Sequence, residues 1–251
     1  RDLRNLNLQP LPGAEAEVRF LEAQADRWGL SALTFINEAA TERQVRALRS
    51  PRILHLATHG FFLPEPDRPR PKKDRTLAQI QRPGESDRFG AQSRPPLSNP
   101  MHRSGLAFAG AKTTLTAWGD NSFPPSETDG ILTADEVGLL QLDDTWLVVL
   151  SACDTGSGEA RAGQGVLGLR RGFMYSGAKN LMLTLWPVED AYTQQFMEQF
   201  YTQALQDGDA AKVLFEYQKS EMLHLRAEKD IASAIRLAGP FVLNNNETLQ
   251  P

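Results

Sequence analysis

The sequence is poor in several features that would mark a particular class of protein. It has a single cysteine in 251 residues, which excludes an internal disulfide and leaves one thiol for packing, metal binding or chemistry. Its 27 Lys and Arg residues are outnumbered by 31 Asp and Glu residues. A protein with this net charge of −4 lacks the basic surface that neutralises phosphates, so we expect no nucleic-acid partner.

Long apolar runs and clusters of metal ligands are missing too. No segment approaches the roughly 18 consecutive apolar residues of a membrane helix, and no charged and then apolar leader opens the chain. We therefore expect no membrane partner, and the lone cysteine fits the reducing cytoplasm. Neither a metal nor an organic cofactor is implied. Because the chain does not begin with Met, we expect that upstream domains are absent from this sequence.

What the chain does contain is 41% apolar residues, in a pattern of alternating strands and helices. Short runs that are apolar at most positions, at 53–57, 146–150 and 181–186, predict strands that are buried on both faces. Shorter strands are expected at 32–36, 105–109 and, at a sheet edge, 241–243; helices are expected at 14–28, 41–48, 133–140, 165–176, around 192–200 and from about 209. The alternation predicts a single α/β domain over 1–251 with a mostly parallel sheet.

Two local signals set boundaries within this domain. The segment 64–104 contains eight of the sixteen prolines, many Arg residues and few large apolar ones, which predicts an exposed insertion. Further on, Thr133 is followed three residues later by Glu136. This spacing matches a capping box, in which the two side chains satisfy backbone N–H groups at the start of a helix.

Two reactive side chains follow predicted buried strands. His59 comes just after the strand at 53–57, and Cys153 just after the strand at 146–150. Sites in open parallel sheets lie beyond the carboxyl ends of the strands, so we expect the two to meet there. His59 would then take the thiol proton, and the backbone N–H groups of Gly60 and Cys153 would form an oxyanion hole. Taken singly, such a Cys or His is more often a packing residue.

Four segments carry a family resemblance. HLATHGFF (55–62), LSACDTGSGE (150–159), GQGVLGLRRGFMYSGAKN (163–180) and LTLWPVED (183–190) closely resemble the CHAT domains of the caspase-separase clan of cysteine peptidases. The resemblance covers nearly the whole chain, in the family's order. It implies a caspase-like three-layer α/β/α sandwich, a catalytic dyad of His59 and Cys153, and cleavage of protein or peptide substrates through a thioester. It also implies a regulatory protein or a flanking helical repeat domain as a partner.

The resemblance extends to substrate preference. LWPVED is similar to the LWDVTD segment of separase, whose acidic residues help to receive a basic side chain, although Pro187 departs from that pattern. Asp190 matches it, and Glu189, Asp154 and Trp186 lie nearby in sequence. These residues imply a preference for Arg or Lys before the cleaved bond. The alternative interpretation is that the acids are solvated loop residues or helix caps.

Two other functions remain open from the sequence. Gly163, Gly165 and Gly168 match the glycine fingerprint of dinucleotide-binding domains, and Asp190 lies near the distance expected of a ribose-binding acid. In that fingerprint the first glycine follows its strand almost at once, whereas here about a dozen residues separate Ser151 from Gly163. The second alternative is a peptidase-like scaffold that binds protein partners without cutting them.

Overall fold

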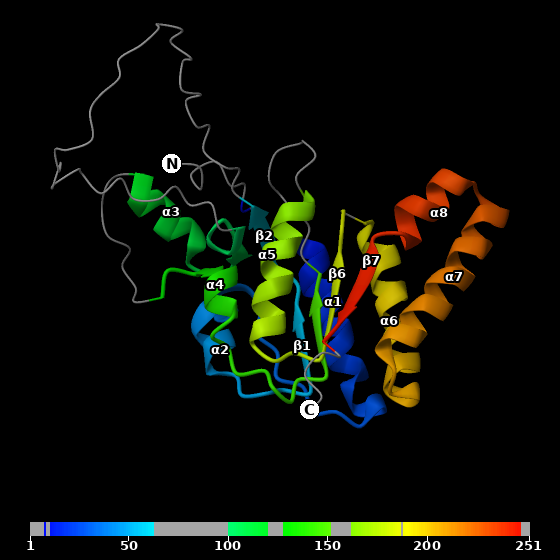
Figure 1. Cartoon of the computed structure of the whole chain (residues 1–251), viewed down its shortest axis with the longest axis horizontal. Coiled ribbons are helices and arrows are strands. Elements are labelled where there is room, and N and C mark those ends of the chain that lie inside the picture. Colours follow the sequence, from blue (N-terminus) through cyan, green and yellow to red (C-terminus); the bar gives the residue numbers. More distant parts are fainter. Residues whose placement is uncertain are drawn as a thin grey trace, which may run out of the picture.

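The computed structural model of the chain describes residues 8, 11–62, 100–119, 128–151, 162–186 and 188–246. Its centre is a four-stranded sheet in the order β1-β5-β6-β7 (Figure 1). The strands are β1 (Ile53–Leu56), β5 (Leu147–Leu150), β6 (Asn180–Thr184) and β7 (Phe241–Asn245). The first three are parallel, and β7 runs antiparallel along the edge. The three mostly apolar runs therefore form the parallel strands that the sequence predicts, although β1, at the sheet edge, is half-buried on one face.

A second, antiparallel sheet begins just after β1 in the chain. It has the order β2-β3-β4 and consists of β2 (His59–Phe62), β3 (Ser104–Ala107) and β4 (Ile131–Thr133). Gly105 is required at its centre, because a Cβ at that position would lie 2.6 Å from the Leu132 carbonyl oxygen and 2.7 Å from the Phe61 ring. The strand expected at 105–109 is thus present as β3, whereas β2 and β4 were not predicted.

Helices cover both faces of the central sheet (Figure 1). Val148 and Leu150 point into a core shared with α2, α4 and α5, while Leu147 and Val149 point into a core shared with α1, α6 and α7. The helices are α1 (Pro12–Ala25), α2 (Glu42–Ala47), α3 (Ala111–Gly119), α4 (Ala134–Val137), α5 (Ala162–Tyr175), α6 (Asp190–Asp207), α7 (Ala210–Glu228) and α8 (Ile231–Ala238), with short 3-10 turns at Asp26–Trp28, Asn37–Ala39 and Pro100–His102. The fold is the predicted three-layer α/β/α sandwich with a mostly parallel sheet.

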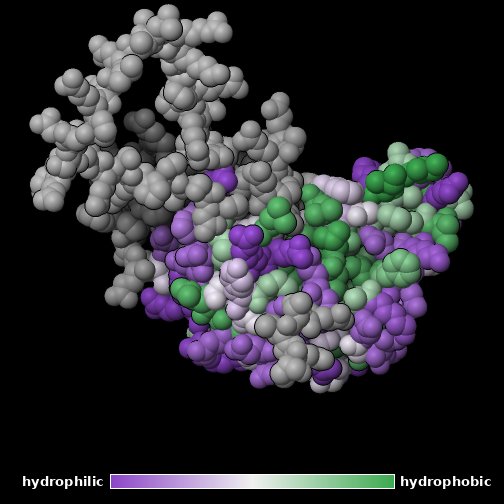
Figure 2. All heavy atoms as spheres, in the orientation of Figure 1, coloured by the Kyte–Doolittle hydropathy of each residue, from purple (hydrophilic) through white to green (hydrophobic). Residues whose placement is uncertain are grey.

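Some features of the helices were not expected. Residues 111–119 form α3, where no helix was predicted, and α4 ends at Val137 rather than near Leu140. Nothing had been predicted for α8, whose buried face packs against the α6–α7 layer. Hydrophobic surface gathers at the α8 end of the molecule in Figure 2, where Leu223, Ile231 and Ile235 are more than half exposed. None of the described helices combines the length and apolar character that a membrane span requires.

The strand predicted at 32–36 is wrong. These residues are extended, but they pair with no described strand. Leu33 is 80% exposed and Phe35 is 38% exposed, and both line an open pocket instead of a closed core. An apolar run predicts a buried strand only if a layer covers it, and no described helix buries this one.

The predicted insertion also ends earlier than expected. Residues 63–99 lie outside the described part of the chain. Residues 100–104, which were assigned to the exposed insertion, include Met101, Arg103 and Ser104, and all three are buried. Pro100–His102 form a 3-10 turn and β3 begins at Ser104, so the boundary at 104 was placed too late.

The capping box at the start of α4 is confirmed and supports a stability prediction. Thr133 accepts a hydrogen bond from the Glu136 N–H (3.3 Å), and Glu136 accepts one from the Thr133 N–H (2.9 Å). We expect Thr133→Ala to lower the free energy of unfolding by about 1 kcal/mol, because it removes one of these bonds. Urea denaturation measures the change. Thr116→Ala, at an exposed position within α3, is the matched control and should cause no loss, since alanine favours helix.

Candidate functional site

The neighbouring ends of β1 and β5 define the candidate site. The two strands are parallel, and Leu56 lies opposite Leu150. The pairing continues one step beyond β5, where the Ser151 N–H donates to the Leu56 carbonyl oxygen over 3.0 Å. The carboxyl ends of both strands are therefore level with each other. This is the edge at which parallel sheets of this kind place their ligands.

His59 lies just beyond the end of β1. Only Ala57 and Thr58 separate the two, and the Thr58 hydroxyl fixes the turn by donating to the Ala107 carbonyl oxygen. His59 then opens β2 opposite Ala107. Its 9% exposure would shield a proton-transferring imidazole from most of the solvent. Gly60 follows in β2, buried and opposite Leu106.

Cys153 and Asp154 lie outside the described residues, so their contacts are not part of this geometry. The flanking elements are described. β5 ends at Leu150, and the chain resumes at Ala162, the first residue of α5. α5 packs on the sheet, and its N-terminal end faces the carboxyl end of β5 (Figure 1). The first turn of a helix carries N–H groups without internal partners, which favour negative charge nearby.

The residues predicted to bind a basic side chain follow β6, the other neighbour of β5. The Trp186 indole N–H donates to the Arg236 carbonyl oxygen over 3.0 Å, which ties it to α8. Glu189 is exposed at the N-cap position of α6, yet its side chain makes no capping hydrogen bond. Asp190 is the first residue of α6, and its side chain lies outside the described part. Glu189 therefore does not cap the helix, but its exposure fits the other half of that alternative, a solvated acid.

One buried polar cluster next to these strand ends was missed by the sequence analysis. It consists of Glu17 in α1, His55 in β1, Ser151 after β5 and Tyr201 in α6. A signal was available in part, because His55 is a polar residue within an otherwise apolar strand. Nothing in the sequence could indicate its partners, since Glu17 and Ser151 are 134 residues apart.

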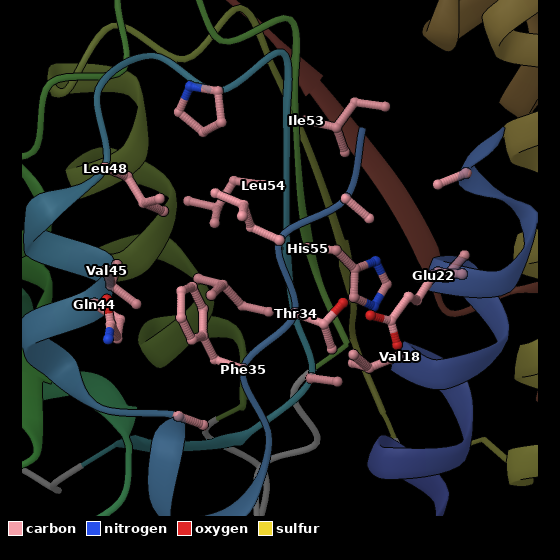
Figure 3. A pocket seen from close by; sticks show the side chains of 18 of the residues that line it. Val18, Glu22, Thr34, Phe35, Gln44, Val45, Leu48, Ile53, Leu54 and His55 are labelled. Atoms are coloured by element: carbon pink, nitrogen blue, oxygen red, sulfur yellow. The ribbon is translucent and has the colours of Figure 1, made fainter. Parts of the chain in front are cut away.

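A pocket of about 400 Å³ lies along the outer edge of β1, on the side away from β5. Side chains from α1, α2, β1 and the segment 30–35 line it (Figure 3). Most of them are apolar, including Val45, Leu48 and Leu54. The pocket extends to Leu56, Ala57 and Thr58 at the carboxyl end of β1, and His59 is not among its lining residues.

The dinucleotide-binding alternative does not fit the described backbone. The glycine fingerprint belongs in the turn between a strand and a helix. Here Gly163, Gly165 and Gly168 all lie within α5, which begins at Ala162. The glycines therefore cannot form the phosphate-binding turn.

Comparison with known families agrees with the fold and with the placement of the motifs. The profile of the CHAT domain matches residues 1–236, nearly the entire chain. The chain belongs to the CHAT domain family. CHAT domains are related to caspase-like cysteine peptidases, which is consistent with the three-layer sandwich and its mostly parallel sheet.

A curated relative extends the comparison. Over 89 residues, this CHAT domain is 36% identical to the Homo sapiens protein tetratricopeptide repeat protein 28. The match covers 36% of the chain but only 4% of the relative's length.

Proposed function

We propose that this CHAT domain is a cysteine endopeptidase in which Cys153 is the nucleophile and His59 the general base. The observation that carries the proposal is the register of β1 and β5. Leu56 and Leu150 are paired, and His59 and Cys153 each follow their member of this pair by three residues. Two chains that leave neighbouring parallel strands at the same level begin side by side. An imidazole and a thiol within hydrogen-bond reach are the arrangement that acyl transfer requires.

The proposed chemistry proceeds in two halves. His59 accepts the proton of the Cys153 thiol as sulfur forms a bond to the peptide carbonyl carbon, and the N–H groups of Gly60 and Cys153 stabilise the oxyanion. The C–N bond then breaks, and His59 returns the proton to the departing amine. Water, activated by His59, attacks the resulting thioester. This step releases the carboxylic acid and restores the thiol.

We further propose that the enzyme prefers Arg or Lys before the cleaved bond. Glu189 supports this proposal, because its carboxylate is exposed beyond the β6 end and forms no cap on α6. Asp154 and Asp190 would add negative charge, with Trp186 beside them. A peptide library that varies only this position measures the preference. Faster cleavage after Arg and Lys is expected, and a preference for Asp, Leu or Met contradicts it.

Regulation by a partner is part of the proposal. The relative that this chain resembles is named for its tetratricopeptide repeats, which supports a repeat domain, either flanking or in a separate protein, that controls the peptidase. The same observation would suit a scaffold that binds partners without cutting them. The two differ in the reactivity of Cys153, because a scaffold needs only an ordinary thiol.

A peptidyl acyloxymethyl ketone that ends in Arg tests the proposal directly. The chain has a single cysteine, so any added mass reports Cys153 alone. We expect stoichiometric labelling of the folded chain, much faster than labelling of the same chain in urea. Cys153→Ser should acquire no mass. Equal rates in the folded and unfolded chain would instead identify a scaffold.

A further inference from the structure

A buried carboxylate connects the two strands that carry the proposed dyad. Glu17 lies in α1 and is only 6% exposed, on the sheet face that α1 and α6 cover. Its two oxygens have different partners. The Ser151 hydroxyl donates to Oε2 over 2.8 Å, and His55 Nε2 lies 3.3 Å from Oε1, an ion-pair distance without the alignment of a hydrogen bond. One side chain therefore holds both β1 and the end of β5.

Tyr201 completes the cluster from α6. Its hydroxyl lies 2.9 Å from His55 Nδ1. Burial raises the pKa of Tyr201 well above its ordinary value, and the Glu17 charge adds to this effect, so the phenol keeps its proton. The hydroxyl can then donate to Nδ1 or accept from it, according to the tautomer of His55. Figure 3 shows the His55 imidazole pointing from β1 toward α1.

Ser151 links this cluster to the proposed nucleophile. Ser151 precedes Cys153 by two residues, and it is held twice, by its N–H to Leu56 and by its hydroxyl to Glu17. His55 likewise precedes His59 by four residues in β1 and the turn that follows. Burying a carboxylate in this layer is unfavourable unless it is paired, and burying an apolar residue of similar size would cost less free energy. The cluster's contribution is therefore to geometry.

We infer that Glu17 is a positioning residue for Cys153, acting through Ser151. The inference rests on the function proposed above. The Glu17 carboxylate sets where the chain leaves β5 relative to β1, and so the distance between the thiol and the His59 imidazole. Small displacements of reacting groups lower rates strongly, even when the altered residue touches no substrate.

A double-mutant cycle tests the role. We expect Glu17→Ala and Ser151→Ala each to lower kcat for a peptide substrate by about 10- to 100-fold, with KM little changed. The double variant should lose no more than the worse single variant, because both remove the same hydrogen bond. Glu17→Gln keeps an acceptor for Ser151 and should restore most of the rate. Glu15→Ala removes a half-exposed acid on the same helix that pairs with Arg19; it is the matched control and should leave kcat unchanged.

The alkylation rate of Cys153 with iodoacetamide separates this inference from the proposed function. If the parent chain cleaves peptides and the variants match it in kcat and in alkylation rate, the positioning role is overturned and the peptidase function stands. Losses that multiply in the double variant overturn it as well. If the parent thiol reacts like a free thiol and cuts nothing, the peptidase function fails, while altered alkylation in Ser151→Ala still supports the positioning role. Should Glu17→Ala not fold, Ser151→Ala and Glu17→Gln give the same decision.

Discussion

Replacing His59 with alanine should lower kcat/KM for peptide hydrolysis by about 10²- to 10⁴-fold, the contribution that a positioned general base makes. The physical reason is that a thiol without a base is only a few per cent ionised near neutral pH, and the departing amine loses its proton donor. Steady-state kinetics on a peptide ending in Arg measure the loss. KM should change little, because the imidazole contributes to the transition state rather than to ground-state binding.

The control for this experiment is another histidine. His224 lies on the exposed surface of α7, beside Glu228, and His224→Ala should retain full activity. Because His59 is buried, His59→Gln, which keeps most of the side-chain volume, guards against a loss caused by packing. A thermal melt of each variant separates folding from chemistry. Folded variants with unchanged kcat/KM would remove His59 from the mechanism.

Phe196→Ala should produce the largest loss of stability, about 3–5 kcal/mol. Phe196 is 1% exposed in α6, and its ring stacks on Phe241 of β7 with centroids 3.8 Å apart. It also contacts Tyr217 of α7, with a centroid separation of 4.8 Å. Removing the ring leaves a cavity where two helices meet the sheet edge. Guanidinium denaturation measures the change.

Phe215→Ala is the matched control for this substitution. Phe215 lies on α7 but is 66% exposed, so its removal should change the free energy of unfolding by no more than about 0.5 kcal/mol. If Phe196→Ala lowered the free energy of unfolding as little as Phe215→Ala, the α6–α7 layer would add little to the stability of the sheet.

The sequence predicted best what depends on continuous burial. The runs around Leu54, Val148 and Met182 are mostly apolar, and all three became parallel strands; β5 and β6 are buried along their whole length, whereas one face of β1 is half-buried. The helices that cover them also appeared close to their predicted places. Periodicity failed for residues 32–36, because an apolar run does not reveal whether a layer will cover it. It also failed at His59, where a two-residue turn starts a second sheet that no local signal announced.

The candidate site also has residues that the sequence could indicate and residues that it could not. His59 and Cys153 could be selected because each follows a buried strand and lies in a recognisable motif. Where Cys153 lies relative to His59 stays a prediction. The polar cluster beneath them could not be found from the sequence, because Glu17, Ser151 and Tyr201 come from three distant parts of the chain and meet only in the folded layer.

The place of α1 limits how far the chain can be shortened. This first helix supplies Leu21 to the core of the α6–α7 face and Glu17 to Ser151. A truncation designed from the strands alone would start near Ile53 and discard both residues. It would expose the His55 imidazole and one side of the Tyr201 phenol to water. Any shortened version intended to keep the fold should therefore begin no later than Pro12.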